Sequence, residues 1–336
     1  MRPTYLPRLV NDPLEDPALF IPLLFEKRAL LFDMGNLNPL PPKELLKITH
    51  GFVTHTHMDH FAGFDGLLRL FLDRNKSLHL FGPARFLQNI EGKLAGYTWN
   101  LVTNRADGFL LTATEVHVDH TLTQVYPRKD AFRPQEPTQK GPFDGTLVKE
   151  PAFSVRAIHL DHQIPCLAFK LEERFHVNIM KDRLKGLNVP VGPWLRRFKE
   201  ALYEGQDREK DFQILWEEKG RTKKASFVLA DLARQIAHIT PGQKIVYVVD
   251  VVFSSENAEK IIRFSRDADH LFIEAAFLHA EADLARKKYH LTAAQAGTLA
   301  REAGVKRFTL FHFSPRYGQC PHLLKQEALE AFGKAG

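Results

Sequence analysis

The sequence predicts an α/β protein, a four-layer αβ/βα sandwich with a helical insertion. Apolar runs of strand length alternate with segments of helical spacing early in the chain and again in its last third. Residues 113–125 and 152–172 carry mostly strand patterns. Two strand-rich halves of this kind can bury their sheets against each other when helices cover the outer faces.

The individual elements are predicted from the spacing of apolar residues and from turn residues. Residues 18–25 and 29–33 are predicted to form two strands around the charged turn Glu26-Lys27-Arg28. Further strands are expected at 51–54, 77–81, 244–250, 270–274 and 307–312. Helices are expected at 60–73, 83–95, 255–266 and 292–303. Residues 127–150 are rich in Pro, Gly and Lys, which predicts a surface loop.

Length and composition indicate a globular protein. The 336 residues are enough for one large domain, so residues 1–336 are treated as a single domain with a polar helical arm inserted at 173–224. Lys and Arg outnumber Asp and Glu by 46 to 40, and the resulting net charge of +6 is compatible with a polyanionic partner.

The cysteines and the apolar runs indicate the cellular compartment in which the protein is expected. The two cysteines, Cys166 and Cys320, lie in no C-x-x-C pattern, which argues against a cysteine zinc site and a disulfide framework and favours a reducing cytoplasm. The N-terminus lacks the apolar core of a signal peptide, and no apolar run approaches the roughly 20 residues that span a bilayer. The sequence therefore predicts a cytoplasmic protein with no membrane partner.

A dense group of metal ligands follows the strand expected at 51–54. Thr54-His55-Thr56-His57-Met58-Asp59-His60 contains the pattern H-x-H-x-D-H. Because side chains alternate along an extended chain, His55 and His57 share one side, and a turn then brings Asp59 and His60 to a second position. Nitrogen and carboxylate ligands suit zinc, and their division into two pairs suits two ions. A histidine-rich surface turn explains this pattern less well.

This pattern after a short apolar strand resembles the metallo-β-lactamase superfamily, and further motifs resemble its tRNase Z (ribonuclease Z) branch. The resemblance extends from about residue 18 to residue 318. It is strongest at 51–72, 158–172, 176–200, 244–277 and 289–317. The family has the αβ/βα sandwich fold, so the resemblance implies the same fold as the strand and helix patterns.

The resemblance also implies the distant ligands. A histidine before the apolar segment at 164–169 matches the family's third motif; His162 is favoured, with His159 as a rival on spacing alone. Asp250 ends an apolar strand, where a charge is costly unless it is paired, and it matches a metal-bridging carboxylate. His312 ends another apolar strand and matches the last ligand.

The implied cofactors are two Zn²⁺ ions, with Mn²⁺ as a substitute. One ion would be bound by His55, His57 and His162, the other by Asp59, His60 and His312, and Asp250 would bridge them. A second histidine-rich stretch, Glu115 to His120, matches nothing in the family, so His117 and His120 are excluded from the site.

The expected chemistry is phosphodiester hydrolysis. Two ions about 3.5–4 Å apart can activate water and stabilise an in-line displacement at phosphorus, and Asp59 would orient that water or accept its proton. Phe272 to Phe277 resembles the family's His-Glu-Ala-Thr-Phe, and Tyr289 to Ala296 resembles its Gly-His-Ser-Thr-Ala-Ala-Gln-Ala. These matches imply that Glu274 and His290 form a dyad in which His290 is the general acid for the leaving 3′ oxygen.

The insertion resembles the family's substrate-clamping arm. Residues 181–199 contain six basic residues and one acidic residue, a patch that attracts phosphate backbones without reading sequence. Arg196, Arg197 and Lys199, which follow the Gly192-Pro193 turn, are the RNA-binding candidates. A solvated helical face is the alternative interpretation of this charge.

The sequence therefore predicts a two-zinc phosphodiesterase that removes the 3′ trailer of precursor tRNA, and the expected partners are precursor tRNA and a second copy in a homodimer. One alternative is a hydrolase of the same fold that acts on a small phosphodiester such as a cyclic nucleotide. Another is a non-catalytic, metal-stabilised RNA-binding module.

Overall fold

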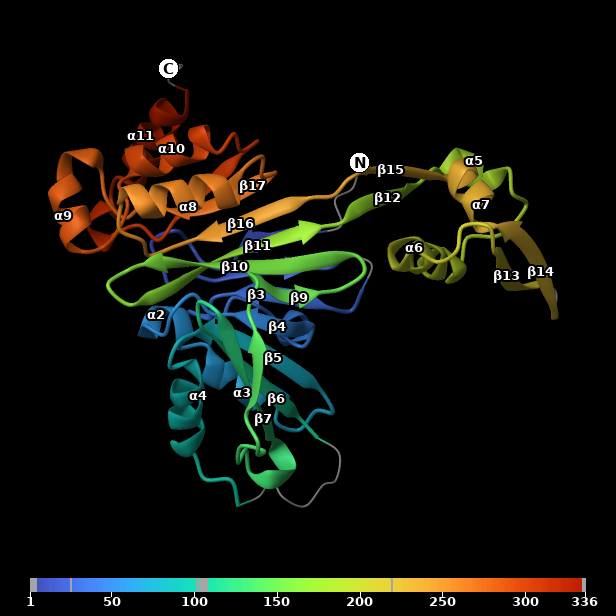
Figure 1. Cartoon of the computed structure of the whole chain (residues 1–336), viewed down its shortest axis with the longest axis horizontal. Helices are drawn as coiled ribbons and strands as arrows, with labels where there is room; N and C mark the ends of the chain where they lie inside the picture. The colour runs from blue at the N-terminus through green and yellow to red at the C-terminus, as the bar shows by residue number, and fades with distance from the viewer. Residues whose placement is uncertain (1–4, 25, 101, 103–107, 219, 334–336) are drawn as a thin grey trace. The chain divides into compact units, whose positions relative to one another are not determined.

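The computed structural model describes residues 5–24, 26–100, 102, 108–218 and 220–333 (Figure 1). The chain divides into two compact units. The larger, the sandwich unit, contains residues 5–147, 155–170 and 244–333 of the described chain. The smaller, the arm unit, contains Val148–Ser154 and Leu171–Gln243. No helix among the described residues is long and apolar enough to cross a membrane.

The first sheet has eight strands in the order β1 to β8. Their bounds are Arg8–Leu9, Leu19–Pro22, Ala29–Phe32, Ile48–Phe52, Ser77–Pro83, Leu110–Val116, His120–Pro127 and Gln139–Pro142. Strands β3 to β6 run parallel, and the strands at either side of them pair antiparallel. The parallel central strands read as apolar runs because both of their faces are buried.

The second sheet has six strands in the order β18-β17-β16-β11-β10-β9. In chain order from β9 these are Thr146–Lys149, Phe153–Asp161, Pro165–Glu173, Lys244–Val248, His270–Glu274 and Phe308–Phe311. Aromatic rings join the two sheets: the Phe32 ring lies 5.6 Å from Phe169 and 5.9 Å from Tyr247. The two sheets therefore pack face to face around a buried aromatic layer.

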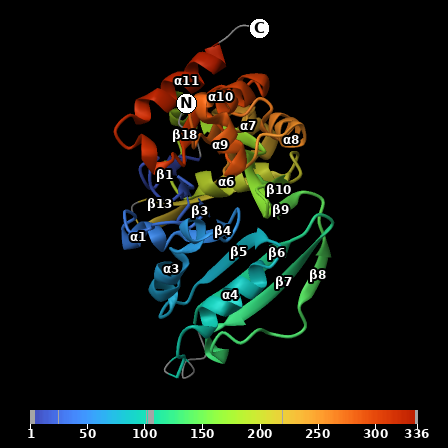
Figure 2. The same cartoon turned by 90° about the vertical axis from the view of Figure 1, so that its left-hand side faces the viewer.

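Helices cover the outer face of each sheet, as Figure 2 shows. On the first sheet these are α3 (Phe64–Phe71) and α4 (Phe86–Ala95), whose apolar sides share a core with β3 and β5. On the second they are α8 (Ser255–Ser265), α10 (Ala293–Glu302) and α11 (Pro321–Gly333), which share a core with β16 and β17. Two shorter helices are α1 (Pro42–Leu45) and α9 (Ala282–Lys287). The predicted four-layer sandwich is confirmed.

The helix expected at 60–73 is interrupted. It forms as α2 (Met58–Phe61) and α3, with a break at Ala62 and Gly63. A Cβ atom on Gly63 would lie 2.2 Å from the backbone oxygen of Gly35, so only glycine permits this approach. The close contact between the two backbones explains the break, which helical spacing alone did not reveal.

The surface loop expected at 127–150 contains regular structure. A 3₁₀ helix at Arg128–Asp130 and the edge strands β8 and β9 lie within it. Phe132 is also buried in the core of the first sheet. Edge strands need only one backbone partner, so a polar, Pro-containing segment can form them without an apolar pattern.

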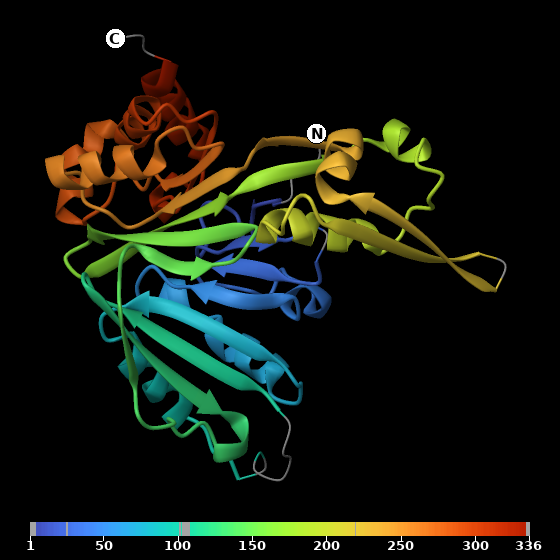
Figure 3. The ribbon, with the colours of Figure 1, turned by 45° about the vertical axis from the view of Figure 1, so that its right-hand side comes forward.

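The arm unit has more strand than the sequence predicted, and it continues past residue 224 to Gln243. Its helices are α5 (Lys181–Lys185), α6 (Trp194–Glu204) and α7 (Leu229–Ile236). Strands β12 (Phe175–Ile179) and β15 (Ala237–Pro241) form one antiparallel pair. Strands β13 (Asp211–Glu218) and β14 (Arg221–Val228) form a long hairpin, visible in Figure 3. Position 224 falls inside β14, whose first half, Arg221 to Lys224, is a continuous exposed polar run with no apolar alternation to indicate a strand.

The arm unit has its own apolar core. Trp194 and Phe198 of α6, Leu232 of α7 and Ile214 of β13 are all buried together in it. The Trp194 indole Nε1 donates a hydrogen bond to the Pro190 carbonyl oxygen at 2.8 Å, which fixes the start of α6.

Candidate metal centre and active site

The candidate ligands follow the carboxyl ends of neighbouring strands in the sandwich unit. Asp250 lies two residues after β16, Glu274 ends β17, and His312 directly follows β18. Parallel strands bring their carboxyl ends to one edge of a sheet, where side chains from distant segments meet. Asp250 and His312 have φ values of +51° and +59°, so the chain turns sharply and directs these side chains inward.

The H-x-H-x-D-H loop is fixed by backbone hydrogen bonds to the turn after β3. The Met34 amide donates to the His60 carbonyl at 2.8 Å, and the Gly63 amide donates to the Met34 carbonyl at 2.7 Å. His57 is the N-cap of α2, so Asp59 and His60 lie in its first turn. The loop is therefore set by contacts with β3 as well as by its own sequence.

The structure brings the seven predicted ligands together in two groups. The first contains His55, His57, His162 and Asp250, and the second contains Asp59, His60 and His312; in each, the ligand atoms lie within 4.8 Å of one another. A third such group contains Asp250, Glu274, His290 and His312. Asp250 and His312 therefore belong to overlapping groups, an arrangement that suits adjacent ions.

Asp250 lies at the centre of this arrangement. Its Oδ2 is 3.2 Å from Nε2 of His55 and 3.1 Å from Nε2 of His60. Its Oδ1 is 3.2 Å from Nδ1 of His312. The carboxylate is 2 % exposed, so water supplies little compensation for its charge. Its two oxygens thus face different histidines, as a bridging carboxylate requires.

The atoms that face this centre lack hydrogen-bond partners among the described residues. They include Nε2 of His55, Nε2 of His60, Oδ1 of Asp250 and Nδ1 of His312. The three imidazole nitrogens lie close to the oxygens of Asp250, but none of these pairs has the geometry of a hydrogen bond. Buried polar atoms are normally satisfied, and these all converge on one place. The residues therefore fit a divalent metal ion, for which imidazole nitrogens and carboxylate oxygens are suitable ligands.

Burial and neighbouring charges shift the pKa values of these groups in opposite directions. Burial, together with His60, lowers the pKa of His55 to about 4, which keeps its imidazole neutral. Burial would also lower the pKa of His60, but the carboxylates of Asp33 and Asp250 outweigh it and raise that pKa well above its usual range. Burial would raise the pKa of Asp59, but the hydrogen bond from His312 and the adjacent imidazole of His60 hold it well below its usual range.

Glu274 and His290 form a hydrogen-bonded pair beside this centre. His290 Nδ1 donates to Oε2 of Glu274 at 2.8 Å. The other carboxylate oxygen of the fully buried Glu274 accepts the Val251 amide at 2.7 Å, next to Asp250. Burial would lower the pKa of His290, but Glu274 and Asp250 raise it to about 10. The imidazole is therefore held in one orientation and kept protonated.

A buried network that the sequence analysis missed supports the ligand loop. Asp33, fully buried after β3, accepts hydrogen bonds from the Thr54 amide at 2.7 Å and from His60 Nδ1 at 2.9 Å. Tyr247 on β16 donates to the same carboxylate at 3.0 Å from the opposite sheet. Bonding at Nδ1 leaves Nε2 of His60 for a metal ion. Asp33 could have been found from the sequence, because it directly follows an apolar strand. The same pattern pointed to Asp250.

Replacing Tyr247 with phenylalanine is expected to weaken metal binding. The change removes one donor from Asp33 without changing packing, so His60 is held less firmly. Loss of such outer contacts typically lowers metal affinity about 10- to 100-fold. Competition with a chromophoric chelator measures this affinity directly.

Tyr126→Phe is the matched control for this experiment. Tyr126 is equally buried and donates to a carboxylate, Oε1 of Glu91, at 3.0 Å, but it belongs to the core of the first sheet rather than to the ligand network. Both variants lose a hydrogen bond from a buried tyrosine to a carboxylate, which is worth about 1 kcal/mol of stability. Equal metal affinities for the two variants would contradict a role for Tyr247 in holding the ligands.

The rival and excluded histidines make other contacts. His159 donates from Nε2 to the Val116 carbonyl oxygen at 3.2 Å. The His117 and His120 rings stack on each other at 4.3 Å, His117 lies 2.8 Å from Glu115, and His120 bonds to Asp119. Within the described residues, no group of potential metal ligands includes any of these three histidines.

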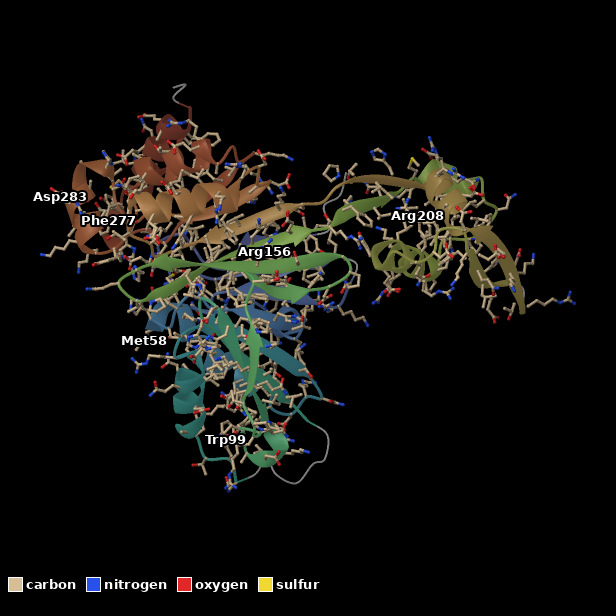
Figure 4. The ribbon with its side chains drawn as sticks, viewed as in Figure 1. Met58, Trp99, Arg156, Arg208, Phe277 and Asp283 are labelled. Atoms are coloured by element: carbon tan, nitrogen blue, oxygen red, sulfur yellow. The ribbon has the colours of Figure 1, made fainter. Side chains whose placement is uncertain are left out.

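A pocket of about 350 Å³ opens beside the second ligand group. Asp59, His290 and His312 line it, together with Asp16 and Phe277. Figure 4 labels Phe277 and also Met58 of the ligand loop, and both lie on the left-hand side of the view. The candidate general acid therefore faces a space into which a substrate can enter.

The RNA-binding candidates of the arm unit all lie on α6. Arg196 and Arg197 are exposed, and Arg196 pairs with Glu200 at 2.8 Å one turn along the helix. Lys199 is half-buried, and burial lowers the pKa of its ammonium group although Glu173 opposes this shift. The arginines are therefore the more accessible cations.

Solved structures with the same fold define the class of this protein. The metallo-β-lactamase fold protein YhfI of Bacillus subtilis is 15% identical, with a TM-score of 0.54 over 95% of this chain and 86% of that one. The short form of human tRNase Z is 18% identical, with a TM-score of 0.52 over 92% of this chain and 93% of that one. These similarities show that the chain has the metallo-β-lactamase fold, and the ligand groups above give it a candidate metal centre.

Sequence relatives identify the family within this class. Ribonuclease Z of Deinococcus radiodurans is 30% identical over 314 residues, which cover 92% of this chain and 90% of that protein. Ribonuclease Z of Lactiplantibacillus plantarum is 28% identical and covers 92% of this chain and 86% of its own. No family model matches the chain. The chain belongs to the ribonuclease Z family.

Proposed function

We propose that this protein is a tRNA 3′-processing endoribonuclease that removes the 3′ trailer of precursor tRNA with two bound Zn²⁺ ions, or Mn²⁺ in their place. The observation that carries this proposal is the arrangement of the three groups. The group that contains the Glu274–His290 pair shares Asp250 with the first ligand group and His312 with the second. Relatives named ribonuclease Z support an RNA substrate. We further propose that the protein acts in the cytoplasm and that it forms a homodimer. Light scattering would measure the mass of this dimer in solution.

Asp59, His290 and Glu274 have different roles in the proposed reaction. When bound, the divalent ions activate water at neutral pH and neutralise charge on the phosphoryl oxygens. Asp59 orients the attacking water or accepts its proton. His290, held by Glu274 through Nδ1, donates a proton from Nε2 to the leaving 3′ oxygen of the tRNA. Glu274 touches no substrate; it orients His290 and stabilises its charge.

Two substrates tested side by side distinguish the proposal from its alternatives. Metal-loaded protein should cleave both precursor tRNA and bis-p-nitrophenyl phosphate. Cleavage of the small diester alone would favour a small-phosphodiester hydrolase. Failure to cleave either would favour the non-catalytic RNA-binding module.

Replacing Arg196, Arg197 and Lys199 with alanine is expected to raise the Michaelis constant for precursor tRNA. Each lost phosphate contact should also flatten the log–log salt dependence of binding by roughly 0.7–0.9. Turnover of the small diester should change little, because these side chains belong to the arm unit and the ligands to the sandwich unit. A salt series with both substrates measures the effect.

A charge-matched control separates local contacts from net charge. Arg263, Arg266 and Lys325 are exposed on or next to helices of the sandwich unit, and their replacement removes the same three charges. If this control weakens tRNA binding as much as the α6 variant, the arm makes no specific RNA contact.

A further inference from the structure

The helix that precedes His290 ends in an unusual way. After α9, the Tyr289 amide donates to the Arg286 carbonyl at 3.1 Å, and the His290 amide donates to the Ala285 carbonyl at 2.9 Å. These two bonds form a Schellman motif in which Tyr289 occupies the left-handed position, with φ of +60°. Glycine is strongly preferred there, because a Cβ atom disfavours positive φ.

The backbone of Tyr289 makes a hydrogen bond that a glycine at this position could make equally well. Its carbonyl oxygen accepts a hydrogen bond from His162 Nδ1 at 2.8 Å, which leaves Nε2 of His162 for a metal ion. The motif that this segment resembles has glycine at the same position. The side chain of Tyr289 therefore opposes the local backbone conformation, and neither the turn nor the contact with His162 requires it.

The ring of Tyr289 lies at the active site. Its centroid is 6.4 Å from that of His162, in an edge-on arrangement at 90°. His162 is in turn 5.3 Å from the candidate general acid His290, the next residue after Tyr289. The Tyr289 side chain is half-buried, so part of it is open to solvent. Residues in disfavoured conformations at such sites commonly serve a function that offsets the strain.

We propose that Tyr289 binds substrate: its ring is a platform on which a nucleobase next to the scissile phosphate stacks. This inference rests on the proposed RNA substrate. Every nucleobase has a π face, so an aromatic ring holds a flanking nucleotide without reading its identity. A nucleotide held there is aligned with both the metal ligand His162 and the proton donor His290.

The experiment combines enzyme variants with a modified substrate. Precursor tRNA is prepared with and without abasic nucleotides on either side of the scissile phosphate. For the wild type, the abasic substrate should raise the Michaelis constant roughly 5- to 150-fold, the equivalent of one lost base–aromatic stack. Tyr289→Gly should raise it similarly for the intact substrate and show no further rise with the abasic one. Tyr289→Phe keeps the ring and should retain the abasic effect.

Metal content and folding are measured on the same variants. Glycine is the preferred residue for this turn, so Tyr289→Gly should fold and keep its metal. An unchanged Michaelis constant in Tyr289→Gly, or an abasic effect as large as in the wild type, would overturn the inference. A loss of bound metal would also overturn it, because the ring would then support His162 instead of substrate. A wild-type protein that cleaves no precursor tRNA would instead reject the proposed function and this inference with it.

Discussion

Replacing Asp250 with alanine is expected to reduce bound metal from about two divalent ions per chain to less than one. Its two carboxylate oxygens face His55 and His60 on one side and His312 on the other. Without this carboxylate, the first ligand group loses a member and the proposed bridge to the second group is lost. Hydrolysis should slow at least about a thousandfold, because metal ions supply several kcal/mol of transition-state stabilisation. Elemental analysis and turnover of both substrates measure these losses.

Asp269→Ala provides the control. Asp269 precedes β17 at the opposite end from Glu274, where it accepts the Lys244 amide at 2.8 Å and pairs with Lys306. This variant also loses a carboxylate but should keep both ions. Wild-type protein with one ion or none after zinc or manganese loading would rule out the dinuclear centre, whatever the behaviour of the Asp250 variant.

Replacing His290 with alanine is expected to slow cleavage of precursor tRNA by about 10² to 10⁴, the usual contribution of general acid catalysis. The 3′ oxygen of a ribose is a poor leaving group and needs the proton that His290 supplies. The p-nitrophenolate group leaves without such help, so bis-p-nitrophenyl phosphate should be affected much less. Bound metal should be retained, since the two proposed ligand groups remain intact.

The comparison of the two substrates decides the role of His290. Equal losses on tRNA and on the nitrophenyl ester would indicate a structural role. His270→Ala is a suitable control, because it removes a largely buried histidine from the start of the strand that ends at Glu274. The Nε2 of His270 lies 2.7 Å from the Thr309 hydroxyl oxygen, and no candidate ligand group among the described residues includes His270. Both substrates should therefore turn over normally.

Several site residues were predictable because the signal is local. The H-x-H-x-D-H loop carries four candidate ligands within six residues, and the strand before it is a short apolar run. Asp250 and His312 could be found at a distance because each follows an apolar strand, where a polar side chain needs a partner. His162 and His159 could not be separated by spacing; in the structure, His162 joins the ligand group and His159 does not.

Other features had no sufficient local signal. The break between α2 and α3 depends on Gly63 contacting Gly35, which is distant in the sequence. The edge strands β8 and β9 form because neighbouring strands offer unpaired backbone groups, not because their own residues favour strands. The arm unit was expected to be helical. In the structure, β13 and β14 pair as an antiparallel hairpin, so their backbone groups form hydrogen bonds between strands instead of within a helix.

Local patterns were sufficient to predict the class of fold and the candidate ligands, because apolar periodicity and a dense histidine motif each extend over a few residues. How the candidate ligands are supported depends on the tertiary structure. Tyr247 and Asp33 lie 214 positions apart, and their hydrogen bond exists because two sheets pack face to face. The strained turn at Tyr289 likewise contacts a distant segment: its carbonyl oxygen accepts a hydrogen bond from His162, which lies between β10 and β11. Such contacts depend on how distant segments pack, and no pattern within either segment encodes them.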